Sequence, residues 1–583
     1  MSRYLLAILT CLCLASYVAA AGGKDKKRAP NIILIMADDM GYGDLGFTGN
    51  PKIKTPNLDR LAKKSVRMKQ FHVCPVCSPT RSSLLTGRYN YRTGVVDTFL
   101  GRSMMHPDEV TLAEVLAAMG YRTGIFGKWH LGDCYPLRPQ DHGFQETLVL
   151  RGGGIGQPSD PPGGSSYFDP VLQHNGKQIN AKGYCSDVFT EAALDFIGKN
   201  RDRPFFCYLP FNAPHSPHQV PESYEAPYRK MDLNPDQFPK VGFPLPPKAK
   251  TDDIAKVYGM VTNIDDNVGK VLAKLRELGL EEDTIVIFLT DNGASFPRFN
   301  AGMRGFKGSV FEGGTHVPFF VQWKGHLPED RDVSQIAAHI DLVPTLLDLV
   351  GGKAAEGKKI DGVSLAPLWK GEKVDWPERN LFFQWHRGDV PQLFRACAVR
   401  SQKYRLVQPA GVDDKAKFNG LTAKFLLFDI ESDPFEQNDI SDKAPEVVQE
   451  MKAAYQKWFR DVVGTRTVVP PRIVIGAKEA DPVVLTKQDW RGPKASWGPT
   501  GQGYWELKVA AAGTFEVSVH LPEKAPAGVV HLKIGGKETA RRAEESQVTF
   551  EDINLSAGNV RLEAWLASGG ELRAIRFVKV SRK

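Results

Sequence analysis

Short apolar runs that alternate with longer helical patterns are the feature that most constrains the fold. The segments 111–119 and 253–278 place apolar residues at helical spacing between the runs. Strands that alternate with helices predict an α/β domain with a mostly parallel central sheet flanked by helices. The runs that we interpret as buried strands are Asn31–Ala37, Thr123–Phe126, Phe205–Phe211, Thr284–Thr290 and Pro318–Trp323.

The pattern changes after residue 345. Residues 397–407 and 425–429 alternate like strands, and residues 444–463 form an amphipathic helical pattern. These segments predict a small α+β C-terminal subdomain over residues 346–465, after an α/β domain over residues 22–345. Short alternating strands with Gly and Pro turns follow, and they predict an additional all-β sandwich over residues 466–583.

The first 21 residues have the pattern of a secretory signal peptide. Arg3 precedes an apolar run, and small residues follow at Ala19–Ala21. The run is too short to span a membrane, and no later apolar run reaches that length. We therefore expect a secreted or periplasmic protein without a membrane span. Six cysteines follow this segment, too few for a disulfide scaffold in a chain of 583 residues, and their pairing stays open.

The overall charge favours an anionic partner. The formal net charge is +8 at pH 7, which suits an anionic substrate better than a cationic one. Lys and Arg are not concentrated in one tract, so we expect no nucleic-acid partner.

Acidic and amide side chains follow two of the predicted strands. Asp38 and Asp39 come after the first, and Asp291 and Asn292 come after the fourth. One such pair is common in turns and helix caps, but the carboxyl ends of parallel strands meet at one edge of a sheet. Oxygen ligands from two strand ends predict a site for calcium, with magnesium as the alternative. The similar Asp265–Asn267 lies within an apolar helical period, so we interpret it as part of a helix face.

Basic side chains follow the second and third predicted strands, at the same predicted edge. Lys128 and His130 come after the second strand, and His215 comes after the third. A single histidine is more often structural than catalytic, but their common position makes these three residues candidate catalytic groups. The glycine- and proline-rich segments 152–164 and 232–248 are expected to be long surface loops.

The segment from Val73 to Tyr89, VCPVCSPTRSSLLTGRY, contains two closely spaced cysteines. Cys74 and Cys77 could form a redox pair, contribute to a zinc site, or simply pack in the core. Pro79 and Arg81 follow Cys77 at fixed spacing and favour another interpretation. We expect a helix from Ser82 onward, and a helix N-terminus favours bound anions.

This segment resembles the signature of the type I sulfatases, the arylsulfatase-like enzymes with an alkaline phosphatase-type fold. Their cysteine is oxidised to formylglycine by a maturation enzyme. The resemblance covers roughly residues 30–465, and one departure is His316, which stands where the family often has an arginine. The other family motifs match Asp38-Asp39, Gly127–Gly132, Pro214–Pro217, Asp291–Gly293 and Arg304–Gly308.

The resemblance implies hydrolysis of aryl sulfates or sulfated carbohydrates. The hydrated formylglycine formed from Cys77 would attack sulfur with one hydroxyl and expel sulfate with the other. His130 would be the base for that expulsion, and His215 with Lys307 would protonate the leaving oxygen. Charge in the transition state would be offset by Arg81, Lys128 and Lys307. The implied metal ligands are Asp38, Asp39, residue 77, Asp291 and Asn292.

Two alternatives to a sulfatase remain open. One is a phosphate or phosphonate ester hydrolase of the same superfamily, and the other is a non-catalytic carbohydrate-binding protein with a sulfatase fold. The sandwich carries an aromatic cluster that would either pack against the catalytic domain, which we favour, or offer a surface for stacking sugars. Its members are Trp490, Trp497, Tyr504 and Trp505.

Overall fold

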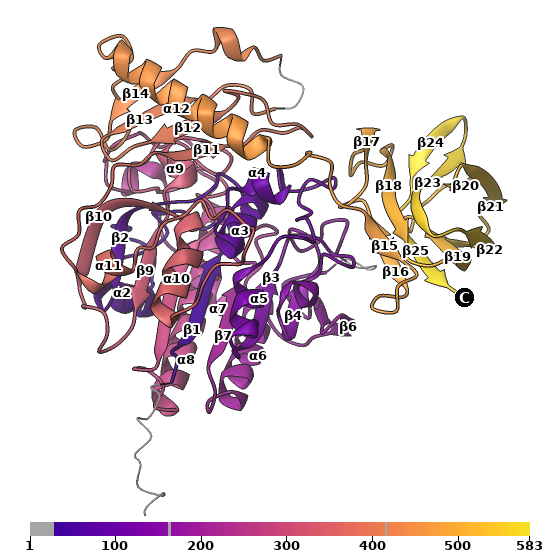
Figure 1. The fold of residues 1–583 in the computed structure, drawn as a ribbon, viewed down its shortest axis with the longest axis horizontal. Helices are drawn as coiled ribbons and strands as arrows, with labels where there is room; N and C mark the ends of the chain where they lie inside the picture. Colours follow the sequence, from indigo (N-terminus) through magenta and orange to yellow (C-terminus); the bar gives the residue numbers. More distant parts are fainter. Residues whose placement is uncertain (1–27, 161–164, 414–416) are drawn as a thin grey trace, which may run out of the picture.

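The computed structural model describes residues 28–160, 165–413 and 417–583. The predicted signal peptide, residues 1–21, lies outside the described residues. A large α/β body carries a small α+β layer at its top in Figure 1, and a β-sandwich forms a separate lobe at its side. This arrangement confirms the predicted fold class.

The core of the body is a ten-stranded sheet with the order β10-β2-β9-β8-β1-β7-β3-β4-β5-β6. Its centre is parallel, because β1 pairs in parallel with β7 and β8, and β3 with β7 and β4. The strands are β1 (Asn31–Ala37), β2 (Val66–His72), β3 (Arg122–Lys128), β4 (Glu146–Leu150), β5 (Val171–His174), β6 (Lys177–Asn180), β7 (Phe205–Pro210), β8 (Thr284–Thr290), β9 (Phe319–Gln322) and β10 (Arg331–Ala338).

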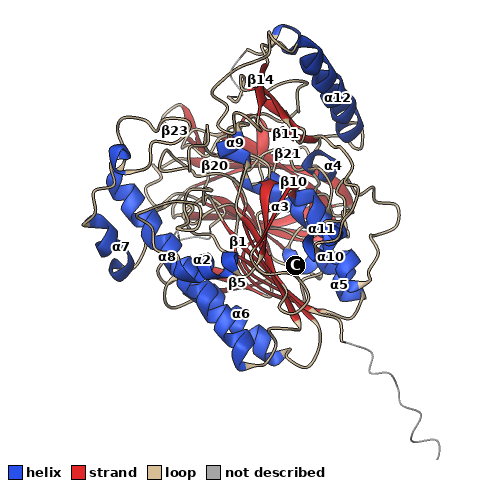
Figure 2. Cartoon of the chain, turned by 90° about the vertical axis from the view of Figure 1, so that its left-hand side faces the viewer, coloured by secondary structure: helices blue, strands red, loops and turns tan. Residues whose placement is uncertain are grey.

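Helices cover both faces of this sheet (Figure 2). One face packs against α2 (Pro56–Lys63), α6 (Cys185–Lys199), α7 (Glu222–Arg229) and α8 (Thr251–Glu277). The other packs against α3 (Cys77–Thr86), α5 (Leu112–Ala118), α10 (Leu342–Val350) and α11 (Ala366–Lys370). Short helical segments are α4 (Asn90–Thr93), α9 (Glu312–Thr315) and the 3₁₀ helices Pro139–His142, Pro235–Gln237, His339–Asp341 and Gly420–Thr422.

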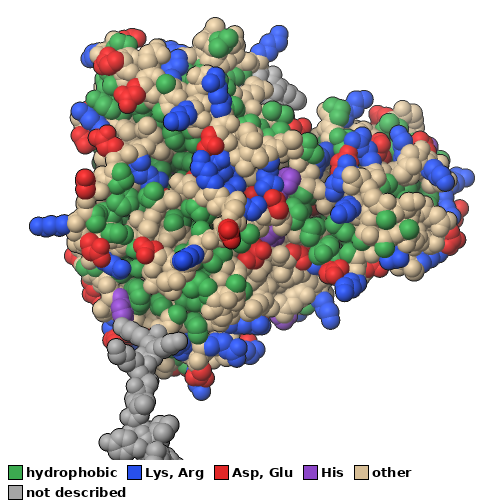
Figure 3. Space-filling view, viewed as in Figure 1, with side chains coloured by type: hydrophobic (Ala, Val, Ile, Leu, Met, Phe, Trp, Pro, Cys, Tyr) green, Lys and Arg blue, Asp and Glu red, His purple; other side chains and the backbone are tan. Residues whose placement is uncertain are grey.

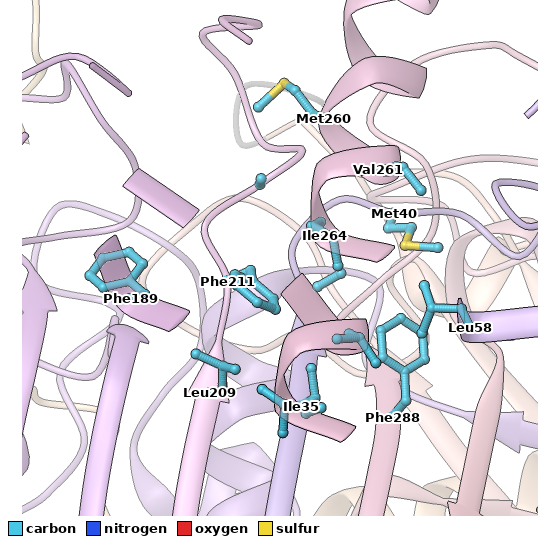
Figure 4. Close-up of a cluster of buried hydrophobic side chains, with 14 of the residues drawn as sticks. Ile35, Met40, Leu58, Phe189, Leu209, Phe211, Met260, Val261, Ile264 and Phe288 are labelled. Atoms are coloured by element: carbon cyan, nitrogen blue, oxygen red, sulfur yellow. The ribbon is translucent and has the colours of Figure 1, made fainter. Parts of the chain in front are cut away.

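The central strand β1 shows why its apolar run is continuous. Ile33 and Ile35 contribute to the core on one face, whereas Ile32, Leu34 and Met36 contribute to the core on the other. A strand buried on both faces needs apolar residues at every position. Figure 4 shows Ile35 with Leu209 of β7 and Phe288 of β8, beneath Ile264 of α8.

The sequence predicted the strongly apolar strands better than the polar ones. β1 and β8 have the predicted bounds, and β3, β7 and β9 differ from theirs by a few residues. β9 runs antiparallel to both of its neighbours. β2, with the sequence VRMKQFH, went unrecognised because Arg67, Lys69 and Gln70 interrupt its apolar pattern.

The α+β layer is a four-stranded antiparallel sheet with the order β11-β12-β13-β14, covered by one helix. Met451, Tyr455, Trp458 and Val462 form the buried face of that helix, as its spacing predicted. The elements are β11 (Leu381–Gln384), β12 (Cys397–Arg400), β13 (Tyr404–Gln408), β14 (Leu426–Asp429) and α12 (Pro445–Val463).

The side lobe consists of two β-sheets around one core. The larger sheet has the order β15-β18-β23-β20-β21, and in addition β17 pairs with β18 and β24 pairs with β23. The smaller sheet has the order β16-β25-β19-β22. Acidic and basic side chains are interspersed on the visible face of this lobe (Figure 3). Its strands are β15 (Ile473–Ile475), β16 (Val483–Thr486), β17 (Arg491–Lys494), β18 (Gln502–Val509), β19 (Gly513–His520), β20 (Val529–Ile534), β21 (Lys537–Arg542), β22 (Gln547–Leu555), β23 (Gly558–Ser568), β24 (Glu571–Ala574) and β25 (Phe577–Arg582).

The sandwich shares its core with the body. Leu100, Met104 and Leu137 of the body belong to the same buried cluster as Trp490 and Trp505 of the sandwich. Both tryptophans are fully buried. For these two members of the aromatic cluster, the packing interpretation is therefore correct.

The six cysteines of the described residues are all unpaired and buried. Within the same residues, every helix is too short or too polar to cross a bilayer.

Candidate active site

The carboxyl ends of four adjacent parallel strands meet at one edge of the sheet. The strands lie in the order β8-β1-β7-β3. Asp291 follows β8, Asp38 follows β1, His215 follows β7 by a short loop, and Lys128 ends β3. The tertiary structure brings these predicted site residues together, as the strand-end argument expects.

Acidic and amide groups form the floor of this site. Asp38, Asp39, Asp291 and Asn292 are all buried. The Asp39 backbone N–H donates to Asp291 Oδ1 at 3.2 Å, and Asn292 Nδ2 donates to Asp39 Oδ1 at 2.9 Å. Asp39 has a positive φ of 66°, an unusual backbone conformation for a residue other than glycine. The two strand ends are thus directly connected by hydrogen bonds.

Three basic side chains surround these carboxylates. Arg81 Nη2 lies 2.8 Å from Asp291 Oδ2 and 3.3 Å from Asp38 Oδ2. Lys128 pairs with Asp38, and Lys307 Nζ lies 2.5 Å from Asp39 Oδ1. Buried charges require such partners, because an unpaired charge in the interior is strongly destabilising.

Burial and neighbouring charges shift the pKa values of the two adjacent aspartates in opposite directions. Burial, followed by the charge of Asp291, raises the pKa of Asp38 to about 7, although Lys128 opposes the shift. Burial would also raise the pKa of Asp39, but Lys307 and His215 hold it well below its ordinary value. Burial opposes the charge of Lys307, yet Asp39 raises the pKa of Lys307 overall, so this lysine stays cationic.

The floor has the chemistry of a divalent cation site. Asp38 Oδ1 and Asn292 Oδ1 are buried without a hydrogen-bond partner. Ligand atoms of Asp38, Cys77 and Asp291 lie within 4.8 Å of one another. Unpaired buried oxygens with converging carboxylates fit a hard cation that prefers oxygen ligands.

The similar group Asp265–Asn267 plays a different part. It lies within α8, where Asp265 accepts hydrogen bonds from the backbone N–H groups of Asn57 and Leu58 at 3.1 and 2.7 Å. This carboxylate therefore caps the start of α2, and it lies outside the strand-end cluster.

Cys77 is the first residue of α3. The helix thus begins five residues before the expected start at Ser82, because proline is tolerated in the first turn and Pro79 does not interrupt it. Cys77 Sγ lies 3.4 Å from His130 Nδ1. Burial raises the pKa of the Cys77 thiol, which disfavours a reactive thiolate. Its position at the helix N-terminus nevertheless suits the binding of an anion.

His130 is oriented toward residue 77. Its Nε2 lies 2.8 Å from the carbonyl oxygen of Thr98 and donates to it, which leaves Nδ1 as the hydrogen-bond acceptor toward Cys77. Burial, with Lys128 second, holds the pKa of His130 well below its ordinary value. A neutral imidazole with a free lone pair is suited to accept a proton.

His215 lies beside Asp39 of the acidic floor. Its Nδ1 lies 2.7 Å from the carbonyl oxygen of Ser216, and its Nε2 lies 3.8 Å from Asp39 Oδ2. Burial lowers the pKa of His215 to about 3, although Asp39 opposes the shift. An anion bound beside it would raise this pKa again.

The glycines that begin segment 152–164 pack directly against both histidines. The prediction of a surface loop is therefore wrong for the first residues of this segment, which are buried. Gly153 and Gly154 are buried. A Cβ atom on Gly153 would lie 2.4 Å from His130 Cε1, and one on Gly154 would lie 2.9 Å from His215 Cε1. Only glycine fits this close backbone approach. The available signal was the position of these glycines after β4, at the same edge of the sheet.

A cavity of about 440 Å³ opens above Cys77. His130, His215 and Lys307 line it, as predicted, but several further residues were missed. They come from loops and from the later parts of the chain, where strand-end reasoning does not apply. These residues are Thr98, Phe99, Gln157, Trp385 and Arg387. Trp497, a member of the aromatic cluster noted in the sequence, also lines the cavity.

The residue that departs from the family pattern has a structural environment. His316 Nδ1 lies 2.8 Å from Glu312 Oε2, and His316 Nε2 lies 2.8 Å from the carbonyl oxygen of Lys69. Its ring also stacks on His72 at 4.9 Å. These contacts keep His316 within a buried polar network.

Comparisons with known proteins identify the family of this chain. The Sulfatase family model matches residues 30–352, more than half of the chain, and the model for the N-sulphoglucosamine sulphohydrolase C-terminal region matches residues 305–461. Arylsulfatase A of Bos taurus is 32% identical over 489 residues, which cover 76% of this chain and 89% of that protein. N-acetylgalactosamine-6-sulfatase of Mus musculus is 34% identical over 380 residues, with 60% and 68% covered.

A solved structure shows the same fold. The crystal structure of Ps i-CgsB in complex with k-i-k-neocarrahexaose superimposes with a TM-score of 0.64 at 29% identity, and covers 76% of this chain and 94% of its own. The family match, the curated relatives and the fold lead to one conclusion. The chain belongs to the sulfatase family and is a sulfuric ester hydrolase.

Proposed function

We propose that this protein is an exported sulfatase that uses a formylglycine made from Cys77 and a bound calcium ion, with magnesium as the alternative. The observation that carries the proposal is the position of Cys77. It starts α3 within 3.4 Å of His130 Nδ1 and beside the carboxylates of Asp38 and Asp291. A buried thiol with a raised pKa is poorly suited to act as the nucleophile itself.

The cation would be held by Asp38, Asp39, residue 77, Asp291 and Asn292. When bound, it would polarise the oxygens of the sulfate ester and lower the pKa of the attacking hydroxyl. The formylglycine would supply a hydrated aldehyde as the nucleophile. Both groups fit the unpaired oxygens and the helix N-terminus at this site.

The surrounding side chains have separate roles in this proposal. Three cationic side chains offset negative charge on the sulfate group. They are Lys307, whose pKa is raised, and Lys128 and Arg81, which pair with the carboxylates. His130 accepts a proton at Nδ1, because Thr98 holds its Nε2 proton. His215 donates a proton to the leaving oxygen after the anionic substrate has raised its pKa.

The substrates that we propose are aryl sulfates and sulfated carbohydrates. The relatives include an N-acetylgalactosamine-6-sulfatase, and one similar structure holds a neocarrahexaose. A formal charge of +8 suits such anionic substrates. The same proposal includes export through a signal peptide at residues 1–21 and a maturation enzyme as partner. It also includes the domain boundaries at residues 345 and 465.

The mass of the peptide that contains residue 77 tests this function. We would produce the protein together with a formylglycine-generating enzyme and expect the cysteine to be replaced by the aldehyde. The matched control is the Cys74→Ala variant, because Cys74 is also buried but is not followed by proline and arginine at the spacing found after Cys77, and residue 77 of this variant should be converted as in the wild type. A residue 77 that stays a thiol while a reference sulfatase is converted would contradict the proposal.

The same preparation separates the alternative activities. We expect it to hydrolyse the sulfate ester of 4-nitrophenol faster than the phosphate ester of the same alcohol. Faster hydrolysis of the phosphate ester would favour a phosphate or phosphonate hydrolase. A converted protein that binds saccharides without hydrolysing any ester would favour the non-catalytic alternative.

A further inference from the structure

The β-sandwich contributes a side chain to the cavity above Cys77. Trp497 lies in the loop between β17 and β18, and it lines this cavity together with residues of the other two parts of the chain. Phe99 comes from the loop after α4, and Trp385 and Arg387 come from the segment after β11. We refer to Phe99, Trp385, Arg387 and Trp497 as the aromatic wall.

The members of the aromatic wall contact one another in series. The rings of Phe99 and Trp497 meet edge to face, with centroids 5.1 Å apart at 70°. The guanidinium of Arg387 lies over Phe99 at 4.6 Å and over Trp385 at 4.9 Å. These contacts connect the four side chains into one aromatic and cationic surface that lines part of the cavity.

The sandwich fixes the position of Trp497. Trp497 Nε1 donates to the carbonyl oxygen of Lys487 at 3.3 Å, and Lys487 Nζ donates to the carbonyl oxygen of Trp497 at 3.1 Å. Gln488 Nε2 donates to the carbonyl oxygen of Thr98 at 2.9 Å, and that oxygen also contacts His130 Nε2. The sandwich therefore reaches both the cavity and the residue that orients a catalytic histidine.

Burial separates Trp497 from the other tryptophans of its cluster. Trp490 and Trp505 are fully buried in the shared core and account for the docking of the sandwich. Trp497 is only partly buried and lines the cavity. A large aromatic side chain at a cavity wall is available for ligand contact in a way that a core side chain is not.

We infer that the aromatic wall binds the sugar unit attached to the sulfated one, and that Trp497 determines specificity for saccharide substrates. The apolar C–H face of a sugar ring packs on a flat aromatic face, and a cavity of 440 Å³ falls within the usual range of ligand sites. Arg387 Nη1 pairs with Asp97 Oδ1 at 2.7 Å, and the Arg387 side chain is still 35% exposed, so its other N–H groups would bind a second anionic group on the saccharide. This inference rests on the proposed function, and it assigns the substrate's second binding contact to the sandwich.

The test uses the full-length protein with Cys77→Ala, so that binding is measured without maturation or turnover. Binding would be measured by calorimetry for 4-nitrophenyl sulfate and for sulfated oligosaccharides from carrageenan, chondroitin sulfate and heparin. We expect Trp497→Ala to weaken binding of the best oligosaccharide at least tenfold more than binding of 4-nitrophenyl sulfate. Trp565→Ala is the matched control, because Trp565 is a partly buried sandwich tryptophan that stacks on His531 instead of lining the cavity.

Two further variants separate stacking from packing. Trp497→Tyr keeps a flat aromatic face and should retain most of the oligosaccharide affinity, whereas Trp497→Leu keeps an apolar side chain without that face and should lose it. Equal affinities of these two variants would overturn the inference, as would equal effects of Trp497→Ala and Trp565→Ala. Oligosaccharides that all bind no better than 4-nitrophenyl sulfate would also overturn it.

The proposed function fails by a different measurement. An unmodified Cys77 in the matured preparation would contradict the formylglycine proposal and leave the binding ratios of the Cys77→Ala protein unaffected. The two outcomes are therefore distinguishable.

Discussion

At the scale of single residues, the site depends on which atom of each histidine is free. His130 presents Nδ1 to residue 77 because its Nε2 contacts the carbonyl of Thr98 at 2.8 Å. His215 has the opposite arrangement, with Nδ1 held by the carbonyl of Ser216 and Nε2 toward Asp39. In the proposed mechanism, His130 therefore accepts a proton, and His215 donates one after a bound anion has raised its pKa.

The acid role of His215 predicts a dependence on the leaving group. In the matured enzyme, His215→Ala should lower kcat/KM for an alkyl or sugar sulfate by about 100-fold, within the usual range for general acid catalysis. The loss for 4-nitrophenyl sulfate should be much smaller, because 4-nitrophenolate leaves without protonation. Steady-state kinetics on the two esters measures both values. Equal losses would contradict the assignment of His215 as the acid.

At the scale of secondary-structure elements, the parallel centre of the sheet creates the site. β8, β1, β7 and β3 are neighbours, so residues far apart in the sequence meet where these strands end. The start of α3 adds Cys77 and Arg81 to the same place. Each element contributes one or two groups, and the site exists only where their ends converge.

This convergence predicts that calcium stabilises the folded protein. After chelation, added Ca²⁺ should raise the free energy of unfolding by about 2.7 kcal/mol at a hundredfold excess over its Kd, because it binds only the folded state. Thermal unfolding with and without the ion measures the effect. Asp291→Asn should reduce it strongly. Asp265→Asn is the control, because Asp265 caps α2, and this variant should respond to Ca²⁺ as the wild type does.

At the scale of the whole molecule, three parts of the chain form one cavity. The body supplies the candidate catalytic groups, the α+β layer supplies Trp385 and Arg387, and the sandwich supplies Trp497. The parts also share buried cores, since Leu100 and Met104 of the body pack with Trp490 of the sandwich. Separating the sandwich would expose this apolar surface, so point variants test its role better than truncation.

Buried histidines throughout the molecule predict loss of stability in acid. Burial lowers the pKa of His339 to about 3, from an ordinary value of 6.5. Its imidazole lies 3.3 Å from Cys74 Sγ, in the interior. Below pH 6.5 the unfolded state binds the proton and the folded state does not, so stability falls as the pH decreases toward 3.

The slope from one such group is at most about 1.4 kcal/mol per pH unit. Urea unfolding of the wild type and of His339→Gln at pH 7 and pH 5 checks this prediction. The variant should lose less stability between these pH values than the wild type does. If the wild type and the variant lose the same free energy of unfolding between pH 7 and pH 5, His339 does not contribute to the acid sensitivity.

The sequence by itself determined the strand ends and their chemistry. Apolar runs such as those of β1 and β8 must be buried on both faces, so the polar residues that follow them mark the edge of the sheet. Asp38 and Asp291 could be named for this reason, and the motif around Cys77 indicated the family. Local patterns of this kind need no knowledge of distant contacts.

Only the tertiary structure decided what surrounds these groups. Gly153 lies against His130, and Trp497 lines the same cavity as Cys77 although the two residues are 420 positions apart along the chain. The same cluster of tryptophans divides into buried core residues and one at the cavity, although the sequence pattern does not separate them. The physical reason is that burial and cavity shape depend on how separate elements pack together, and local periodicity carries no information about that packing.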